Sequence, residues 1–236
     1  MKTKILLATA VAALLSAGAV TAQIVNPNFD PDLTGWTTTG DVAPRSGGAF
    51  LTTATNILPG DDAPTEFNFS TFNVVDSFTL ETFAGFASGG LDPDDANSVF
   101  AFEGSAIQQT FNVEAGDFIG FTWQLFTNET SGDDYAFVGI DGALFVLGTS
   151  ASASSGSSFD YSRRTGLATY NSAVFLSAQT VILTIGVVDA GPDGAVSSAL
   201  LIDAAVVPEP STFALLALAS FVGWVAYGRR RSSAAH

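Results

Sequence analysis

The C-terminal part of the chain carries the feature that most limits how it can fold. Residues 211–227 contain no charged residue, and a helix of this length spans roughly 25 Å, just enough for the hydrocarbon core of a bilayer. Prolines precede the run, and three arginines follow it: Arg229, Arg230 and Arg231. Proline interrupts strand pairing, and arginines stay on the cytoplasmic side of a membrane. The pattern predicts a globular part that ends near residue 207, then one transmembrane helix and a cytoplasmic stop. A buried C-terminal helix of a soluble domain is the alternative, but such a helix rarely lacks a polar face.

The proline-containing segment is Val207-Pro208-Glu209-Pro210, and it leads directly into the apolar run. From Val207 to about Arg231 the tail resembles the PEP-CTERM protein-sorting signal, a family defined by a Pro-Glu-Pro motif, a hydrophobic helix and an Arg-rich end. The resemblance implies a Gram-negative surface protein that is sorted by an exosortase, a membrane transpeptidase-like cysteine protease. Pro208, Glu209 and Pro210 would be recognised by that enzyme and would catalyse nothing themselves. Such proteins often belong to bacteria that form biofilm and secrete polysaccharide, so an extracellular polysaccharide is a further expected partner.

The start of the chain agrees with export. Lys2 and Lys4 precede a short apolar stretch over residues 5–15, and small residues lead up to Ala22. This pattern predicts a signal peptide over residues 1–22, cleaved between Ala22 and Gln23 after delivery to the Sec translocon. The mature chain is expected to be anchored in the inner membrane by residues 208–236 before processing, and then to reach the cell surface or the medium.

The composition of residues 23–207 limits the function of the exported domain. These 185 residues hold 22 acidic side chains against three arginines, a formal net charge of −19. Nucleic acid is excluded as a partner, because phosphate binding needs clustered Lys and Arg. An acidic exterior is typical of a secreted protein that stays soluble by charge repulsion and can hold divalent cations. The chain has no cysteine, so no disulfide stabilises the fold.

Side chains for catalysis are scarce in the same stretch. The only histidine is His236, beyond the predicted membrane helix, and residues 23–207 contain no lysine or cysteine. A Ser-His-Asp triad, a Cys-His pair and the usual zinc sites are therefore excluded outside the cell. A glycosidase that uses two carboxylates about 5–9.5 Å apart is the remote alternative, because 22 acids make some pair inevitable. We predict that the protein is not an enzyme.

The middle of the chain alternates apolar and polar residues with the period of a β-strand. In residues 118–126, Ile119, Phe121, Trp123 and Leu125 share one face. Similar runs are Ala49–Thr55, Ser77–Phe83, Ala106–Val113, Tyr135–Val146, Ala168–Leu176, Thr180–Val188 and Ser198–Val207. About eight strands separated by turn residues predict an all-β fold, an antiparallel β-sandwich of the jelly-roll type. Long loops are expected over 85–97 and 148–158, and no helix is expected within 23–207.

Short motifs at both ends of this domain suggest a second resemblance. The opening Asn26-Pro27-Asn28-Phe29-Asp30 and the closing Leu200-Leu201-Ile202-Asp203 resemble galactose-binding-like jelly rolls and related carbohydrate-binding modules. The resemblance implies a structural Ca²⁺ with Asp30 and Asp203 among its ligands, since Ca²⁺ takes six to eight oxygens. The alternative is that Asp30 caps a turn and Asp203 is merely exposed. No other cofactor is expected.

Carbohydrate binding needs exposed aromatic rings beside hydrogen-bonding groups. The candidate residues are Trp36, Tyr135, Tyr161, Tyr170, Arg163 and Arg164. Each of the rings can equally belong to the core or to a strand edge. Three functions therefore compete: a surface structural or matrix protein, which is our first expectation; a carbohydrate-binding module; and a glycosidase. An exposed aromatic cluster would favour the second, and two carboxylates facing each other in a cleft would favour the third.

Overall fold

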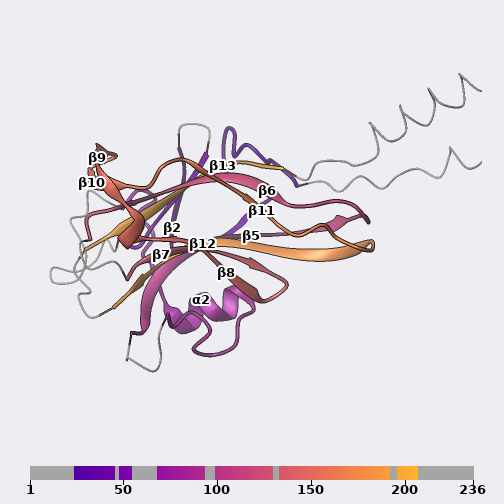
Figure 1. Ribbon diagram of the computed structural model, residues 1–236, viewed down its shortest axis with the longest axis horizontal. Coiled ribbons are helices and arrows are strands. Elements are labelled where there is room, and N and C mark those ends of the chain that lie inside the picture. The colour runs from indigo at the N-terminus through magenta and orange to yellow at the C-terminus, as the bar shows by residue number, and fades with distance from the viewer. Residues whose placement is uncertain are drawn as a thin grey trace, which may run out of the picture.

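The computed structural model describes residues 24–45, 48–54, 68–93, 99–129, 133–191 and 196–206, and these are mostly β-strand (Figure 1). No helix among the described residues is long and apolar enough to cross a membrane. The predicted signal peptide and the predicted transmembrane helix lie outside the described residues.

One sheet is built around two long neighbouring strands, and all its pairings are antiparallel. Its order is β1 (Thr37–Thr39), β5 (Ala101–Val113), β12 (Gln179–Ala190), β7 (Tyr135–Ile140) and β8 (Ala143–Thr149), with β4 (Val75–Asp76) also beside β5. Ile185 of β12 pairs with Ile107 of β5 on one side and with Val138 of β7 on the other. We call this sheet A.

The second sheet, sheet B, is also antiparallel and contains the last strand of the described chain. Its order is β2 (Asp41–Arg45), β3 (Gly48–Thr52), β13 (Ser198–Val206), β6 (Gly120–Thr127), β10 (Tyr161–Arg164) and β9 (Ser154–Ser158), with β11 (Ala168–Asn171) also beside β6. A 3-10 turn, η3 (Ser150–Ser152), precedes β9. The chain changes sheet between β1 and β2, β3 and β4, β5 and β6, β6 and β7, β8 and β9, β11 and β12, and β12 and β13, so the two sheets form a sandwich.

The main core lies between the two sheets. Strand β12 contributes alternate residues to it, as a strand with a period of two must. The buried side chains that fill this layer include Val181, Leu183, Ile185 and Val187 of β12, Ile107 and Phe111 of β5, Trp123 and Leu125 of β6, and Leu200 and Ile202 of β13. The predicted all-β, antiparallel sandwich is therefore confirmed.

The prediction of a strand over residues 77–83 is wrong, because Ser77–Ala84 forms the helix α2. Local capping explains the difference. The Asp76 carboxylate accepts the backbone N–H of Thr79 at 2.9 Å, and Gly85 ends the helix in the left-handed conformation with φ of 73°. Leu80 and Ala84, one turn apart, are both buried. The helix is thus defined by its two caps and a narrow apolar stripe.

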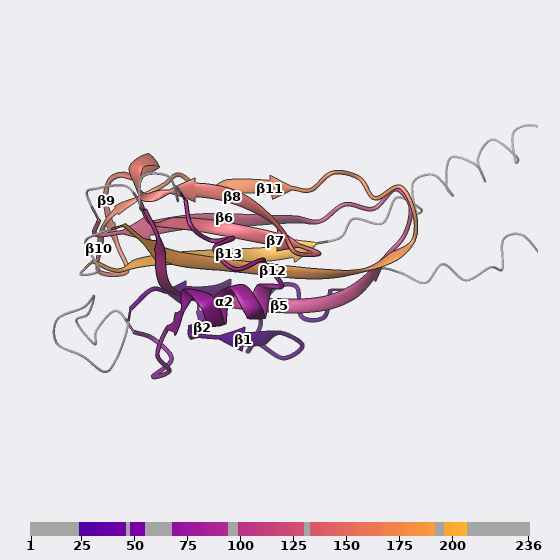
Figure 2. The ribbon, with the colours of Figure 1, turned by 90° about the horizontal axis from the view of Figure 1, so that it is seen from below.

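Helix α2 covers the outer face of sheet A (Figures 1 and 2). Leu80 packs in a second core with Phe137 of β7 and Val188 of β12, whose side chains point away from sheet B. Sheet A is therefore buried on both faces beneath α2, whereas Phe145 and Val146 of β8 and Ile182 of β12 are exposed. A third cluster, on the outer face of sheet B, contains Phe50, Phe126 and Tyr161.

Two further predictions need correction. Residues 135–146 form two strands, β7 and β8, because Asp141 and Gly142 both have positive φ and make the two-residue turn of a hairpin. The expected loop over 148–158 instead contains η3 and β9, whose residues pair with β10. Between 85 and 93, where a loop is expected, the described residues form turns and no strand.

Candidate functional site

The predicted sorting motif begins directly beyond the last described strand. Strand β13 lies inside sheet B, between β3 and β6, and its final residue Val206 pairs with Gly120 at the start of β6. Gly120 pairs in turn with Asn171 at the end of β11. Residues 207–210, which hold Pro208, Glu209 and Pro210, lie outside the described residues, as do the three C-terminal arginines. The structure therefore fixes the position of the last described strand, which ends directly before the motif.

Two loops shape this end of the molecule, and backbone hydrogen bonds join them. The N–H of Phe175 donates to the carbonyl of Asp117 at 2.8 Å, and the N–H of Gly116 donates to the carbonyl of Phe175 at 2.8 Å. Asp117 is itself buried, and its carboxylate accepts the N–H of Glu114 at 2.8 Å. The loop after β11 is therefore held firmly against the loop before β6.

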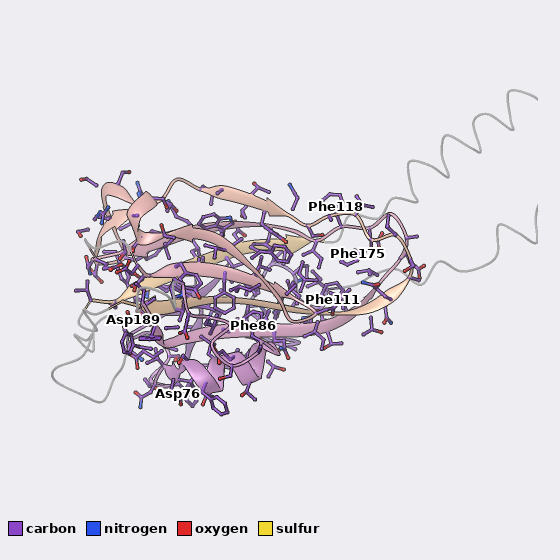
Figure 3. All side chains as sticks on the ribbon, turned by 60° about the horizontal axis from the view of Figure 1, so that its bottom comes forward. Asp76, Phe86, Phe111, Phe118, Phe175 and Asp189 are labelled. Atoms are coloured by element: carbon purple, nitrogen blue, oxygen red, sulfur yellow. The ribbon has the colours of Figure 1, made fainter. Side chains whose placement is uncertain are left out.

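Apolar side chains line the same end. Leu176 is 93% exposed and Val174 is 53% exposed, while Phe118 and Phe175 are partly buried (Figure 3). Phe175 packs against the main core. We call Phe118, Val174, Phe175 and Leu176 the apolar rim. The sequence signal for it is the run Ala173-Val174-Phe175-Leu176, which we expected to lie in a strand, but which follows the end of β11.

The opposite end of the sandwich buries three carboxylates. Glu129, Asp134 and Asp189 are each at most 2% exposed, and we call them the acidic cluster. Asp134 accepts the N–H of Ala190 at 3.1 Å and the hydroxyl of Ser198. Glu129 accepts the Ser150 hydroxyl and, at 3.2 Å, the N–H of Asp134. The carboxylates therefore join β7, β12, β13 and η3.

Burial and the neighbouring carboxylates of the acidic cluster raise the pKa of its central member, Asp134. Burial, followed by the negative charges of Asp189 and Glu129, holds the pKa of Asp134 well above its ordinary value, although the Ser198 hydroxyl opposes this. Arg163 lies beside the cluster and donates to the carbonyls of Glu129 and Ala153. The site thus favours a protonated Asp134, a neutral donor and acceptor inside the fold.

The acidic cluster does not offer the open carboxylate pair of a glycosidase. All three side chains are almost completely buried, so a sugar chain cannot reach them without local opening. Among the described residues, no group of three or more Asp, Glu, His or Cys side chains could hold a metal ion. The arrangement therefore ties strands together rather than presenting a reactive surface.

The two acids predicted to bind calcium lie on neighbouring segments. The N–H of Ala205 in β13 donates to the carbonyl of Pro27 at 2.8 Å, which brings the last strand beside the first described loop. Asp30 and Asp203 are both exposed. The N–H of Asp30 donates to the side-chain carbonyl of Asn26 at 3.0 Å. Calcium binding by Asp30 and Asp203 stays a prediction.

Three of the predicted sugar-stacking residues are core residues instead. Trp36 is 7% exposed, packs on Phe29 with a ring separation of 5.1 Å and donates its indole N–H to the carbonyl of Asn26. Tyr135 and Tyr161 are at most 2% exposed, and the Tyr135 hydroxyl donates to the carbonyl of Leu91. The alternative that these rings belong to the core therefore holds for all three, since a pyranose cannot stack on a buried face.

The remaining candidates are separated between two parts of sheet B. Arg163 has its guanidinium on backbone carbonyls beside the acidic cluster, whereas Arg164 is exposed on the same strand. Tyr170 of β11 is half-buried and packs on Phe121 at 5.1 Å. Burial raises the pKa of its hydroxyl. Tyr170 alone among the predicted rings keeps part of its surface open.

Comparisons with known proteins bear mainly on the tail. Residues 206–231 match the family described as the PEP-CTERM protein-sorting motif, which confirms the resemblance seen in the sequence. A search of curated proteins finds no match. Among solved structures, the chain is similar to the carbohydrate-binding module TmCBM61 in complex with β-1,4-galactotriose, at 11% identity, with 80% of this chain and 99% of that chain covered and a TM-score of 0.36. A TM-score of this size carries no argument about function.

Proposed function

We propose that the chain is an exported surface or extracellular-matrix protein, which an exosortase sorts and processes through its C-terminal segment. The observation that carries the proposal is the PEP-CTERM sorting motif over residues 206–231, which begins at the last residue of the last described strand. The sandwich is then a non-catalytic structural or adhesive domain delivered by that signal. Its partners are the Sec translocon, the membrane and the exosortase.

The position of the motif suits cleavage after folding. Strand β13 pairs with β3 over Ala199–Asp203 and with β6 from Ser198 to Val206, and the motif follows it without an intervening domain. A cut near Pro208, Glu209 and Pro210 would remove the tail and leave every pairing of β13 in place. The released sandwich would keep its main core, to which Leu200 and Ile202 belong.

We infer that the sandwich has the jelly-roll topology. Two four-stranded orders support this: β3-β13-β6-β11 in sheet B and β5-β12-β7-β8 in sheet A. In each order, strands from the start and the end of the domain lie side by side, as two Greek keys require. The termini of the domain therefore meet near one end of the sandwich, where the tail begins.

Carbohydrate binding is the second proposal for the same domain, with an extracellular polysaccharide as the ligand. The partly exposed ring of Tyr170, held by Phe121, supports it. A structural Ca²⁺ at Asp30 and Asp203 would accompany either function. Isothermal titration of the full-length protein in detergent tests both ligands, with Tyr170→Ala and Asp203→Asn as the variants. Heats that are absent, or unchanged by these variants, would reject the corresponding assignment.

The sorting proposal is tested by mass spectrometry of the protein from its native host, with peptide coverage over residues 200–236. We expect mature chains that lack the residues beyond the Pro-Glu-Pro region, and full-length chains in a host without exosortase. The double variant Pro208→Ala, Pro210→Ala should accumulate uncut. Ser232→Ala with Ser233→Ala, beyond the arginines, is the matched control and should be processed normally. An intact C-terminus through His236 in the normal host would overturn the proposal.

A further inference from the structure

The apolar rim is exposed at the end of the sandwich where the last described strand, β13, ends. Its members come from two loops, Phe118 from the loop before β6 and the other three from the loop after β11. An almost completely exposed leucine beside a half-exposed valine leaves adjoining hydrocarbon surface in water. Patches of this kind mark a contact with a partner or a membrane more often than isolated apolar residues do.

Backbone hydrogen bonds and packing of one ring on the core hold the loop after β11 in place. Phe175 is held by its backbone N–H and carbonyl, which bond to Asp117 and Gly116, and its ring packs on the core. Val174 and Leu176, on either side of this inward-facing ring, are the exposed large apolar residues of the loop.

The rim borders Val206, the last described residue of the chain. Val206 pairs with Gly120, and one ring carbon of Phe118 lies 3.5 Å from the position that a Cβ on Gly120 would occupy. Asn171, which starts the loop with the exposed residues, also pairs with Gly120. The rim and Val206 therefore share one end of the molecule, the end at which Figure 3 labels Phe118 and Phe175.

The tether to the predicted membrane helix is short. That helix is expected to begin at residue 211, so only residues 207–210 separate it from Val206. At about 3.3–3.6 Å per residue, five steps reach at most roughly 18 Å. The headgroup layer extends about 5–7 Å beyond the hydrocarbon core on each side. Of the two ends of the sandwich, only the one that carries the apolar rim is held close to the bilayer.

We propose that the apolar rim docks on the bilayer surface in the membrane-anchored precursor and so holds the Pro-Glu-Pro motif at the membrane. The inference rests on the proposed sorting function, because it needs residues 211–227 to be inserted. Contact is hydrophobic: the rim contains no Lys or Arg, and the Asp117 carboxylate beside it is buried. Docking would place the motif at the depth where a membrane-bound protease can cut it.

The experiment uses the absence of cysteine in the chain. Ser177→Cys, next to Leu176, carries an environment-sensitive fluorophore without removing a member of the rim. Ser162→Cys is the matched control, an equally conservative change at an exposed position of β10, at the end of the acidic cluster. Each full-length protein is reconstituted into phosphatidylethanolamine–phosphatidylglycerol vesicles, and flotation separates the inserted protein before emission is recorded.

We expect a blue shift and quenching by nitroxide lipids at position 177, and neither at position 162. Val174→Ser with Leu176→Ser in the Ser177→Cys chain should lower the docked population about tenfold, since each side chain loses apolar contact. Protein that floats but shows the same aqueous emission at both positions overturns docking and leaves the sorting proposal intact. Protein that does not float contradicts insertion of the tail. A shift that grows with protein concentration in detergent without vesicles overturns docking in favour of self-association.

Discussion

The two ends of the sandwich differ in which side chains they bury and which they expose. One end buries the carboxylates of Glu129, Asp134 and Asp189, while the other exposes Val174 and Leu176. Strand β12 connects the ends: Gln179 lies near the exposed loop, and Asp189 lies ten residues further on, roughly 33 Å away at about 3.3 Å per residue. Figure 3 shows Phe175 and Asp189 at opposite ends of the molecule.

The difference teaches that residue type alone does not decide burial. The acids stay inside because Ser150, Ser198 and backbone N–H groups satisfy their oxygens, and because Asp134 can keep a proton. The exposed apolar residues make no such network. Changes at the acidic cluster should therefore affect the stability of the fold, whereas changes at the apolar rim should affect its contacts.

The largest loss of stability is expected from Glu129→Ala. It leaves the Ser150 hydroxyl and the N–H of Asp134 without their acceptor, which should lower the free energy of unfolding by about 3 kcal/mol. Urea unfolding of the protein in detergent measures the change. Glu114→Ala, near the apolar rim, is the control and should change the free energy of unfolding by less than about 0.5 kcal/mol. Equal losses of stability from the two variants would mean that the acidic cluster contributes no more to the stability of the fold than the opposite end does.

A smaller loss is expected from Arg163→Gln, because the guanidinium donates to the carbonyls of Glu129 and Ala153. Hydrogen bonds from a charged donor support a decrease of about 2 kcal/mol in the free energy of unfolding. The neighbouring Arg164 is exposed, so Arg164→Gln provides a control with the same change of charge. If the two variants unfold at the same urea concentration, Arg163 does not support the acidic cluster.

Asp134→Asn should flatten the dependence of stability on pH. The raised pKa of Asp134 means that the folded chain binds more protons than the unfolded chain between the ordinary and the raised pKa. The contribution of Asp134 to the free energy of unfolding is thus complete at low pH and is lost as pH rises. The free energy of unfolding then falls by at most about 1.4 kcal/mol per pH unit. Urea midpoints of both proteins from pH 4 to 8 measure the difference. Parallel curves would contradict the raised pKa.

The smallest effect on folding is expected at the apolar rim. Leu176→Ser, alone or with Val174→Ser, should change the free energy of unfolding by no more than about 0.5 kcal/mol, since both side chains are already largely in water. Phe175→Ala is the contrasting variant. It should lower the free energy of unfolding by more, because that ring packs on the main core. A large loss from Leu176→Ser would show that the rim is structural and would weaken the docking proposal.

Much of the strand pattern could be predicted where the alternation was clean. The run at 118–126 became β6, and the run at 180–188 became the centre of β12. The prediction of a strand over residues 77–83 was wrong, because these residues form part of helix α2. Over only seven residues, the apolar pattern of a strand cannot be told from that of a short amphipathic helix. The Asp76-x-x-Thr79 cap and Gly85 were the signal that would have identified α2.

The candidate sites were less predictable than the strands. Trp36, Tyr135 and Tyr161 have the chemistry of sugar platforms, but their exposure depends on which face of a sheet a second layer covers. Helix α2 covers the face of sheet A to which Tyr135 belongs. Neither acidity nor aromaticity in the sequence indicated that one end would bury carboxylates and the other expose leucine.

The sequence by itself determined the sorting motif and the β character of the domain, because both are local patterns of neighbouring residues. Only the tertiary structure decided that Asp134 reaches the N–H of Ala190, 56 residues away, through the pairing of β7 with β12. It also decided that the apolar rim borders the end of β13, through the pairings of Gly120 with Val206 and Asn171. These sites depend on strands that are distant in the chain, and their register follows from packing of the whole core.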